Sequence, residues 1–279
     1  MADSGELNQV LDLETIELDM FRGRTPDRGG PRIFGGQVVA QALAAAYRTV
    51  EGRICHSLHS YFIRAGDPSI PILYKVERAR DGASFTTRRV TAIQHGRQIF
   101  NLSASFQVPE AGFEHQSTMP GAPDPGGLLN DEQLRALEPE PGDEARKPWP
   151  VEMRPIDPGP RRQIEPREPT FRCWFRARED VGDDVATNQC VLAYASDMSL
   201  MDSSVRPHVI DWNDPKFQGA SLDHALWFHR PCRFSEWHLY VQDSPSASGA
   251  RGFNRGEIYS RDGVLVASAT QEALIRYRS

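Results

Sequence analysis

Two stretches of small apolar residues stand out in the pattern of hydrophobic and polar positions along the chain. The first opens at Gly35-Gly36 and runs to Tyr47, with alanine, valine and leucine at most positions and no proline or charge. Alanine and leucine favour a helix, and this helix is apolar around almost its whole circumference. A helix of that kind is buried, and its alanines let neighbouring backbone approach closely. The pattern therefore predicts an enclosed central helix over residues 37–47.

Runs typical of strands follow this helix. They cover residues 57–64, 73–80, 85–94 and 98–108, and they are rich in β-branched and aromatic side chains. Four strands after one buried helix predict a curled antiparallel sheet wrapped around that helix.

The second half of the chain repeats this order of elements. Residues 185–195 form another stretch of mostly small residues, with Asp183 and Asp184 placed to cap a helix. Strand-like runs follow at residues 225–229, 237–242, 255–260 and 264–275. Five identities between the halves share an offset of 164 residues, which favours a duplication, although an unrelated second domain of similar class is the alternative. The predicted class is α+β, with two antiparallel sheets, each wrapped around a central helix.

A proline-rich stretch separates the halves. Residues 109–169 hold 13 of the 21 prolines, mixed with glycine and acidic residues. Proline removes a backbone donor and blocks both helix and central strand, so this region is not expected to form core sheet. A short helix is predicted inside it at residues 131–137. The predicted domains are residues 1–110, a linker over 111–148, and residues 149–279.

Composition excludes several classes of protein. The net charge of −6 provides no basic field for nucleic acid, and 29 of the 32 basic residues are arginines. No apolar run reaches the roughly 18 residues that a membrane span needs. The acidic beginning of the chain does not resemble a secretion signal. The four cysteines lie far apart and suit reduced thiols, so a cytoplasmic protein is expected.

Common catalytic patterns are missing from the sequence. It contains no G-x-S-x-G, no P-loop, no G-x-G-x-x-G and no His/Glu metal motif, so neither metal nor cofactor is expected. Three polar residues remain, and each lies at the end of a predicted apolar element: Asp197, Ser221 and Gln271. Burying an acid, a hydroxyl and an amide costs stability unless they satisfy one another. A private hydrogen-bond network, exposure at element ends and a catalytic group are all consistent with this placement.

Motifs along the chain resemble those of the bacterial acyl-CoA thioesterase II family. They include FGGQVVAQA at residues 34–42, HSLHSYF at 56–62, DGASF at 81–85 and ASFQ at 104–107. In the second half they are DHALWFHR at 223–230, SASGARGF at 246–253, and DGVLVAS at 262–268 running into Gln271-Glu272. These blocks span nearly the whole chain outside the proline-rich stretch, and they occur in the family's order.

The resemblance implies a double hotdog fold and hydrolysis of fatty acyl-CoA to a fatty acid and CoA. It also implies a catalytic aspartate, threonine and glutamine, which fall on Asp197, Ser221 and Gln271. Serine at position 221 keeps the hydroxyl but lacks the methyl that restricts threonine's rotamers. Water is the implied nucleophile and Asp197 the general base. Backbone N–H groups at a helix start such as Gly36 are expected to meet the oxyanion, and Arg251 is a candidate for binding CoA phosphate.

Two alternatives remain open at this point. One is a hotdog enoyl-CoA hydratase, which needs an Asp/His pair in one site; adjacent Asp223 and His224 would point to opposite faces of a strand. The other is a non-catalytic acyl-CoA-binding protein, because fold alone does not prove activity. An apolar tunnel for the acyl chain is expected, as is a homodimer or larger homo-oligomer by analogy with other hotdog proteins.

Overall fold

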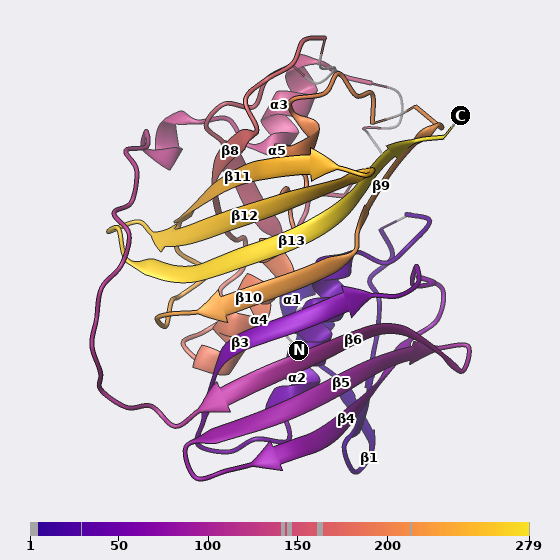
Figure 1. The fold of residues 1–279 in the computed structure, drawn as a ribbon, viewed down its shortest axis with the longest axis vertical. Coiled ribbons are helices and arrows are strands. Elements are labelled where there is room, and N and C mark those ends of the chain that lie inside the picture. The colour runs from indigo at the N-terminus through magenta and orange to yellow at the C-terminus, as the bar shows by residue number, and fades with distance from the viewer. Residues whose placement is uncertain are drawn as a thin grey trace.

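The computed structural model describes residues 5–28, 30–140, 143, 147–160, 164–212 and 214–278. Within this part of the chain, strands of both halves flank a pair of central helices (Figure 1). The elements of the first half are α1 (Glu6–Leu11), β1 (Glu14–Glu17), β2 (Met20–Gly23), α2 (Gly35–Tyr47), β3 (Ile54–Phe62), β4 (Ile72–Asp81), β5 (Phe85–Gln94) and β6 (Arg97–Gln107).

The second half follows a connecting segment that contains η1 (Pro125–Gly127) and α3 (Asp131–Leu137). Its elements are β7 (Val151–Pro155), β8 (Thr170–Ala177), α4 (Val185–Ser196), α5 (Asp202–Val205), β9 (Phe217–Ser221), β10 (Asp223–Phe228), β11 (His238–Ser248), β12 (Arg251–Ser260) and β13 (Leu265–Tyr277). The predicted helix at residues 131–137 is confirmed, and both predicted central helices are present. Asp184 caps α4 by accepting the backbone N–H of Thr187 at 2.8 Å.

The prediction of two separate sheets is not confirmed. The described strands form one antiparallel sheet of 13 strands, in the order β1-β2-β4-β5-β6-β3-β10-β13-β12-β11-β8-β7, with β9 also paired to β13. The halves join where β3 pairs with β10, with Leu58 opposite Leu226. An open strand edge presents unpaired N–H and C=O groups, and joining β3 to β10 satisfies both edges at once.

The described part of the proline-rich stretch contributes a single strand to the sheet, because β7 pairs with β8. The strand lies at the end of the sheet, and Pro155 is its last residue. Proline is tolerated at a sheet edge because one side of such a strand makes no ladder hydrogen bonds.

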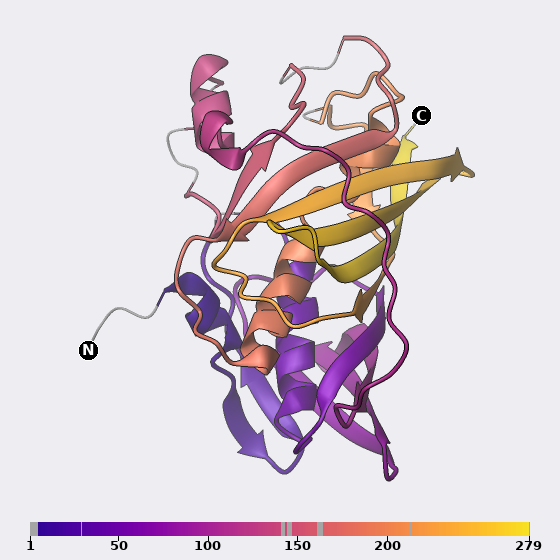
Figure 2. The ribbon, with the colours of Figure 1, turned by 90° about the vertical axis from the view of Figure 1, so that its left-hand side faces the viewer.

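The two central helices lie side by side against the concave face of the sheet (Figure 2). Ten of the 13 residues of α2 and nine of the 12 residues of α4 are buried. Their small side chains permit this close packing. Gly36 is the extreme case, because a Cβ built on it would lie 2.2 Å from the carbonyl oxygen of Tyr194 in α4. The packing therefore brings the start of α2 against the end of α4.

The segment between β6 and β7 packs on the second half. It crosses the outer face of the sheet, where the Ser117 hydroxyl lies 2.8 Å from that of Tyr259 and the Trp174 indole N–H donates to the carbonyl of Pro123 at 2.8 Å. It then reaches α3, which contacts β7. No side chain of α3 is completely buried: Asp131, Glu132, Leu134 and Arg135 are half-buried, and the other three are exposed. This helix is therefore attached to the body of the protein by one face only.

Candidate active site

Asp197 stands where the two central helices meet. It follows α4 directly as its C-terminal cap residue, a position at which the helix dipole disfavours a negative charge. The start of α2 compensates, because the backbone N–H of Gly36 donates a hydrogen bond to the Asp197 carboxylate. The residue before α2, Phe34, provides no side-chain cap. Asp197 therefore caps the N-terminus of α2 from the end of a neighbouring helix.

Ser221 and Gln271 both donate hydrogen bonds to Asp197. The amide Nε2 of Gln271 lies 2.8 Å from Oδ1, and the Ser221 hydroxyl lies 3.2 Å from the same oxygen. Ser221 ends β9, which pairs with β13 opposite Ala273, two residues from Gln271. Three side chains far apart in the sequence thus converge on one carboxylate. The amide oxygen of Gln271 is buried and has no hydrogen-bond partner among the described residues.

Burial raises the pKa of Asp197 from 3.8 to about 6. The hydrogen bonds from Gln271, Ser221 and Gly36 act in the opposite direction, because they stabilise the ionised form. The carboxylate therefore gains basicity from its surroundings and is still predominantly ionised at neutral pH. These are the properties that a general base needs.

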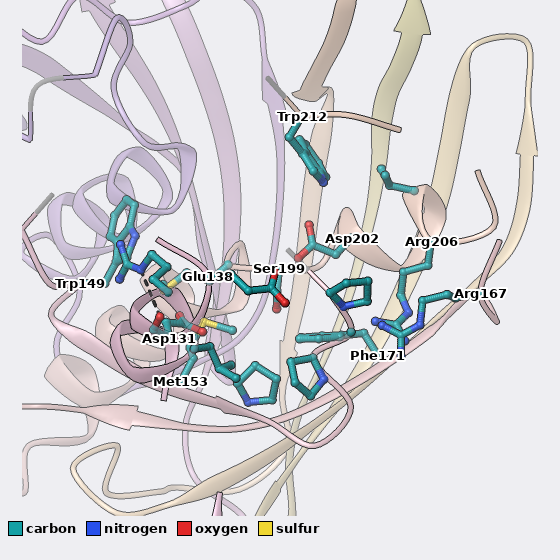
Figure 3. Close-up of a pocket in the computed structure, with 18 of the residues that line it drawn as sticks. Asp131, Glu138, Trp149, Met153, Arg167, Phe171, Ser199, Asp202, Arg206 and Trp212 are labelled. Carbon is teal, nitrogen blue, oxygen red and sulfur yellow. Dashed lines mark hydrogen bonds between the residues drawn. The ribbon is translucent and has the colours of Figure 1, made fainter. Parts of the chain in front are cut away.

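Asp197 opens onto a cavity of about 690 Å³. The walls come from both halves of the chain and from the segment between them. Phe34 precedes α2, and Leu134 belongs to α3. Trp149 and Met153 belong to the start of the second half (Figure 3). Apolar side chains line much of it, which suits an acyl chain. The remaining lining residues include Asp131, Ser199, Asp202, Arg167 and Arg206, the two arginines lying side by side at one end.

Two further carboxylates in this cavity are perturbed. Burial raises the pKa of Asp202 to about 7, and the charge of Asp131 adds to the effect; burial also raises the pKa of Asp131 to about 6. The sequence predicted an apolar tunnel, but it missed both of these residues and the place of the cavity beside α3 and α5. Asp131 is the first residue of the short helix that was predicted, but no local pattern shows where a linker helix docks.

The remaining predicted site residues have mixed outcomes. Gly36 lies in the site, with its N–H directed at Asp197. Arg251 is not brought together with the other residues. It pairs with Glu272 at 2.7 Å, and because side chains alternate along a strand, Glu272 projects from the opposite face of β13 to Gln271. That Arg251 binds CoA stays a prediction.

Asp223 and His224 point to opposite faces of β10, as predicted. Asp223 accepts the backbone N–H of Glu272 at 2.6 Å, whereas His224 is fully buried against Ser196. Neither residue lines the cavity. The two therefore form no joint Asp/His pair of the kind that a hotdog hydratase needs.

Among the described residues, no group of three or more His, Cys, Asp or Glu side chains could hold a metal ion. None of the helices described is long and apolar enough to cross a membrane.

Solved structures define the class of protein to which this arrangement belongs. A hot dog fold protein from Alicyclobacillus acidocaldarius superposes with a TM-score of 0.79 at 19% identity, over 99% of this chain and 100% of that one, which shows the fold alone. The acyl-CoA thioesterase II TesB2 of Mycobacterium marinum superposes with a TM-score of 0.81 at 41% identity, covering 98% of this chain and 99% of that one. The fold is that of the hotdog thioesterases.

Sequence comparisons then identify the family. Residues 23–107 match the acyl-CoA thioesterase N-terminal domain, and residues 161–274 match the acyl-CoA thioesterase family. Acyl-CoA thioesterase 2 of Haemophilus influenzae is 40% identical over 97% of both chains. Human acyl-coenzyme A thioesterase 8 is 41% identical over 96% of this chain and 88% of the human protein. The chain belongs to the acyl-CoA thioesterase family.

Proposed function

We propose that the protein hydrolyses fatty acyl-CoA thioesters to the free acid and CoA, with Asp197 as the general base. The observation that carries the proposal is the convergence of Gln271 and Ser221 on Asp197 at the wall of a cavity that can hold an acyl chain. Membership of the acyl-CoA thioesterase family supports the same activity.

In the proposed reaction, a water molecule attacks the thioester carbonyl carbon while Asp197 removes one of its protons. The C–O bond forms and the carbonyl oxygen becomes an oxyanion. When the oxyanion collapses, the C–S bond breaks, and the proton held by Asp197 passes to the departing CoA sulfur. General-base assistance of this kind supplies roughly 10²- to 10⁴-fold in rate.

Gln271 and Ser221 orient the base and its water in this proposal. Both donate to Oδ1 and so hold the carboxylate in one orientation, and it is this oriented carboxylate that accepts the proton. The amide oxygen of Gln271, which has no partner among the described residues, accepts the second O–H of the same water. A water held at two points approaches the carbonyl in a defined direction, and such positioning lowers the entropic part of the barrier.

The start of α2 stabilises the oxyanion in this proposal. The N-terminal end of a helix favours negative charge, so an oxyanion formed beside Asp197 is stabilised by the dipole of α2, while the Gly36 N–H itself binds Asp197. The acyl chain occupies the cavity between α3 and α5, with its carbonyl end at Asp197.

Replacing Asp197 by asparagine tests this assignment. Release of free thiol from palmitoyl-CoA, followed with a thiol reagent, should fall by at least about 10²-fold in Asp197→Asn. The exposed Asp243→Asn serves as a matched control and should keep wild-type activity. Full hydrolysis by Asp197→Asn would eliminate Asp197 as the base, and a stable acyl adduct on Ser221 in mass spectrometry would indicate a serine nucleophile instead.

We also infer the organisation and setting of the protein. Two hotdog halves, residues 1–110 and 149–279, are joined by the linker 111–148, which agrees with the order of elements in each half. The protein acts in the cytoplasm as a homodimer or larger homo-oligomer. Sedimentation velocity of the purified protein measures the assembly directly, and a monomer at micromolar concentration would contradict it.

A further inference from the structure

The dipeptide Asp223-His224 lies close to all three proposed catalytic residues, Asp197, Ser221 and Gln271. It begins β10, two residues after Ser221, and β10 occupies the middle of the sheet between β3 and β13 (Figure 1). Both β9 and β10 pair with β13, and the interruption between them falls opposite Glu272, where the N–H of Leu222 donates to the carbonyl of Glu272 at 2.9 Å. Contacts that hold residues 222–224 in place therefore also fix the position of Ser221 relative to Gln271.

His224 reaches the neighbour of Asp197. Its Nε2 lies 2.8 Å from the hydroxyl of Ser196, the residue immediately before Asp197. The Ser196 hydroxyl lies within donating distance of the carbonyl of Ala193, at 3.1 Å, and with its proton placed there the Nε2–H of His224 is assigned as the donor to Ser196. Both side chains are completely buried. The bond ties the last turn of α4 to β10.

Further hydrogen bonds hold the same segment. The Tyr240 hydroxyl donates to the carbonyl of Ser196 at 2.8 Å, and the Ser60 hydroxyl of β3 donates to the carbonyl of His224 at 2.8 Å. On the other face of β10, Asp223 accepts the N–H of Glu272, the residue next to Gln271. One dipeptide thus contacts the immediate neighbours of two proposed catalytic residues and follows closely after the third.

We propose that Asp223 and His224 are positioning residues, which set the distances among Asp197, Ser221 and Gln271 without touching the substrate. The inference rests on the proposed function. It accounts for a buried histidine that lines no cavity and for an aspartate directed at a backbone amide. His224 acts as a neutral donor: burial lowers its pKa to about 4, so it does not change charge near neutral pH.

The proposal assigns the effect to one bond, and that bond can be removed from either side. His224→Phe keeps the ring volume but removes the donor, and Ser196→Ala removes the partner. Each should lower kcat by about 10-fold or more while KM changes little, because a general base displaced by a fraction of an ångström no longer holds the water in line with the carbonyl carbon. His224→Gln, whose amide can still donate at that reach, should recover most of the activity.

The pH profile provides a readout that a purely structural role would leave unchanged. When Asp197 loosens from Gln271 and Ser221, it loses bonds that stabilise its ionised form. The midpoint of the acid limb of kcat/KM should therefore move to higher pH in His224→Phe and Ser196→Ala. The groups that interact electrostatically with this carboxylate include Tyr194 and Tyr240, whose pKa values are raised, so both are neutral over this range.

The double variant separates one shared bond from two independent effects. His224→Phe with Ser196→Ala should lose no more activity than the worse single variant, because each change removes the same interaction. On the other face, Asp223→Ala should lower kcat and Asp223→Asn, which keeps an acceptor oxygen, should restore it. If His224→Phe fails to fold, Ser196→Ala still decides the question.

The proposal is overturned if both single variants unfold more easily but keep wild-type kcat and the wild-type acid midpoint, or if His224→Gln is as impaired as His224→Phe. Asp197→Asn, measured in parallel, keeps this failure distinct from failure of the proposed function. An active Asp197→Asn contradicts the function of the site. An inactive Asp197→Asn beside wild-type activity in Ser196→Ala contradicts only the positioning role.

Discussion

The buried carboxylate of Asp197 should make the free energy of unfolding depend on pH in a direction opposite to most acidic residues. Its pKa is about 6 in the folded protein, against 3.8 for the unperturbed group. The folded state therefore holds this proton more tightly than the unfolded chain. The protonated form is the one that folding favours, so stability from this group is present below pH 3.8 and is lost as the pH rises toward 6.

The magnitude follows from the two pKa values. The difference is about two units, which corresponds to about 3 kcal/mol at 1.36 kcal/mol per unit. Asp197→Asn cannot ionise. Relative to wild type, its free energy of unfolding should therefore rise by about 3 kcal/mol between about pH 4 and pH 8. A hydrogen bond lost in the variant lowers its free energy of unfolding by the same amount at every pH. The change of the difference with pH is therefore unaffected, even if the variant is less stable than wild type at a given pH.

Urea unfolding followed by tryptophan fluorescence measures this difference at each pH. Asp67→Asn is a control of opposite sign, because hydrogen bonds from Ser69 lower the pKa of the exposed Asp67. That variant should lose stability relative to wild type as the pH rises. A difference for Asp197→Asn that stays flat, or falls with pH, would show that burial does not raise this pKa and would remove the basis for a tuned base.

Three further predictions concern catalysis. The activity of the wild type should rise with pH through a midpoint of about 6. Gln271→Met should move that midpoint up by about one pH unit or more, since a hydrogen bond to a charged group contributes about 1.5–3 kcal/mol. An unmoved midpoint in a pH–rate series monitored by thioester absorbance would contradict this prediction. Ser221→Thr should raise kcat by at most about threefold, because three staggered rotamers are reduced toward one; a loss of activity would mean that the site has no room for the methyl. Leu134→Trp should reduce hydrolysis of long-chain acyl-CoA more than that of short-chain acyl-CoA, whereas Leu129→Trp, which lies outside the cavity, should leave the chain-length preference unchanged. The same chain-length preference in both variants would place the acyl chain elsewhere.

The central elements could be predicted from the sequence because their patterns are local. Residues 37–47 are apolar around almost the whole helix, residues 185–195 are mostly small and follow a capping aspartate, and the predicted strand at residues 85–94 coincides with β5. The strand β9 was missed because its sequence, FQGAS, has no apolar alternation. The strand β8 was not predicted, although buried Phe171, Cys173 and Phe175 alternate there with Arg172, Trp174 and Arg176.

The site was predicted only as far as the family resemblance allowed. Asp197, Ser221 and Gln271 lie on three elements, and their meeting depends on how α4, β9 and β13 pack, which no local pattern encodes. The same limit explains why the residues that line the cavity were not predicted, because α3 supplies one wall and no local pattern shows where that helix docks.

The way the sheet ends has a consequence for how copies of the protein can associate. Its outermost strands are short. Strand β1 has four residues, all exposed and two of them glutamates, and strand β7 has five residues and ends in Pro155. Charge, brevity and proline all discourage the addition of a foreign strand. Strand addition between copies at β1 or β7 is therefore disfavoured, and we expect an oligomer to form through the faces of the protein rather than through these two sheet edges.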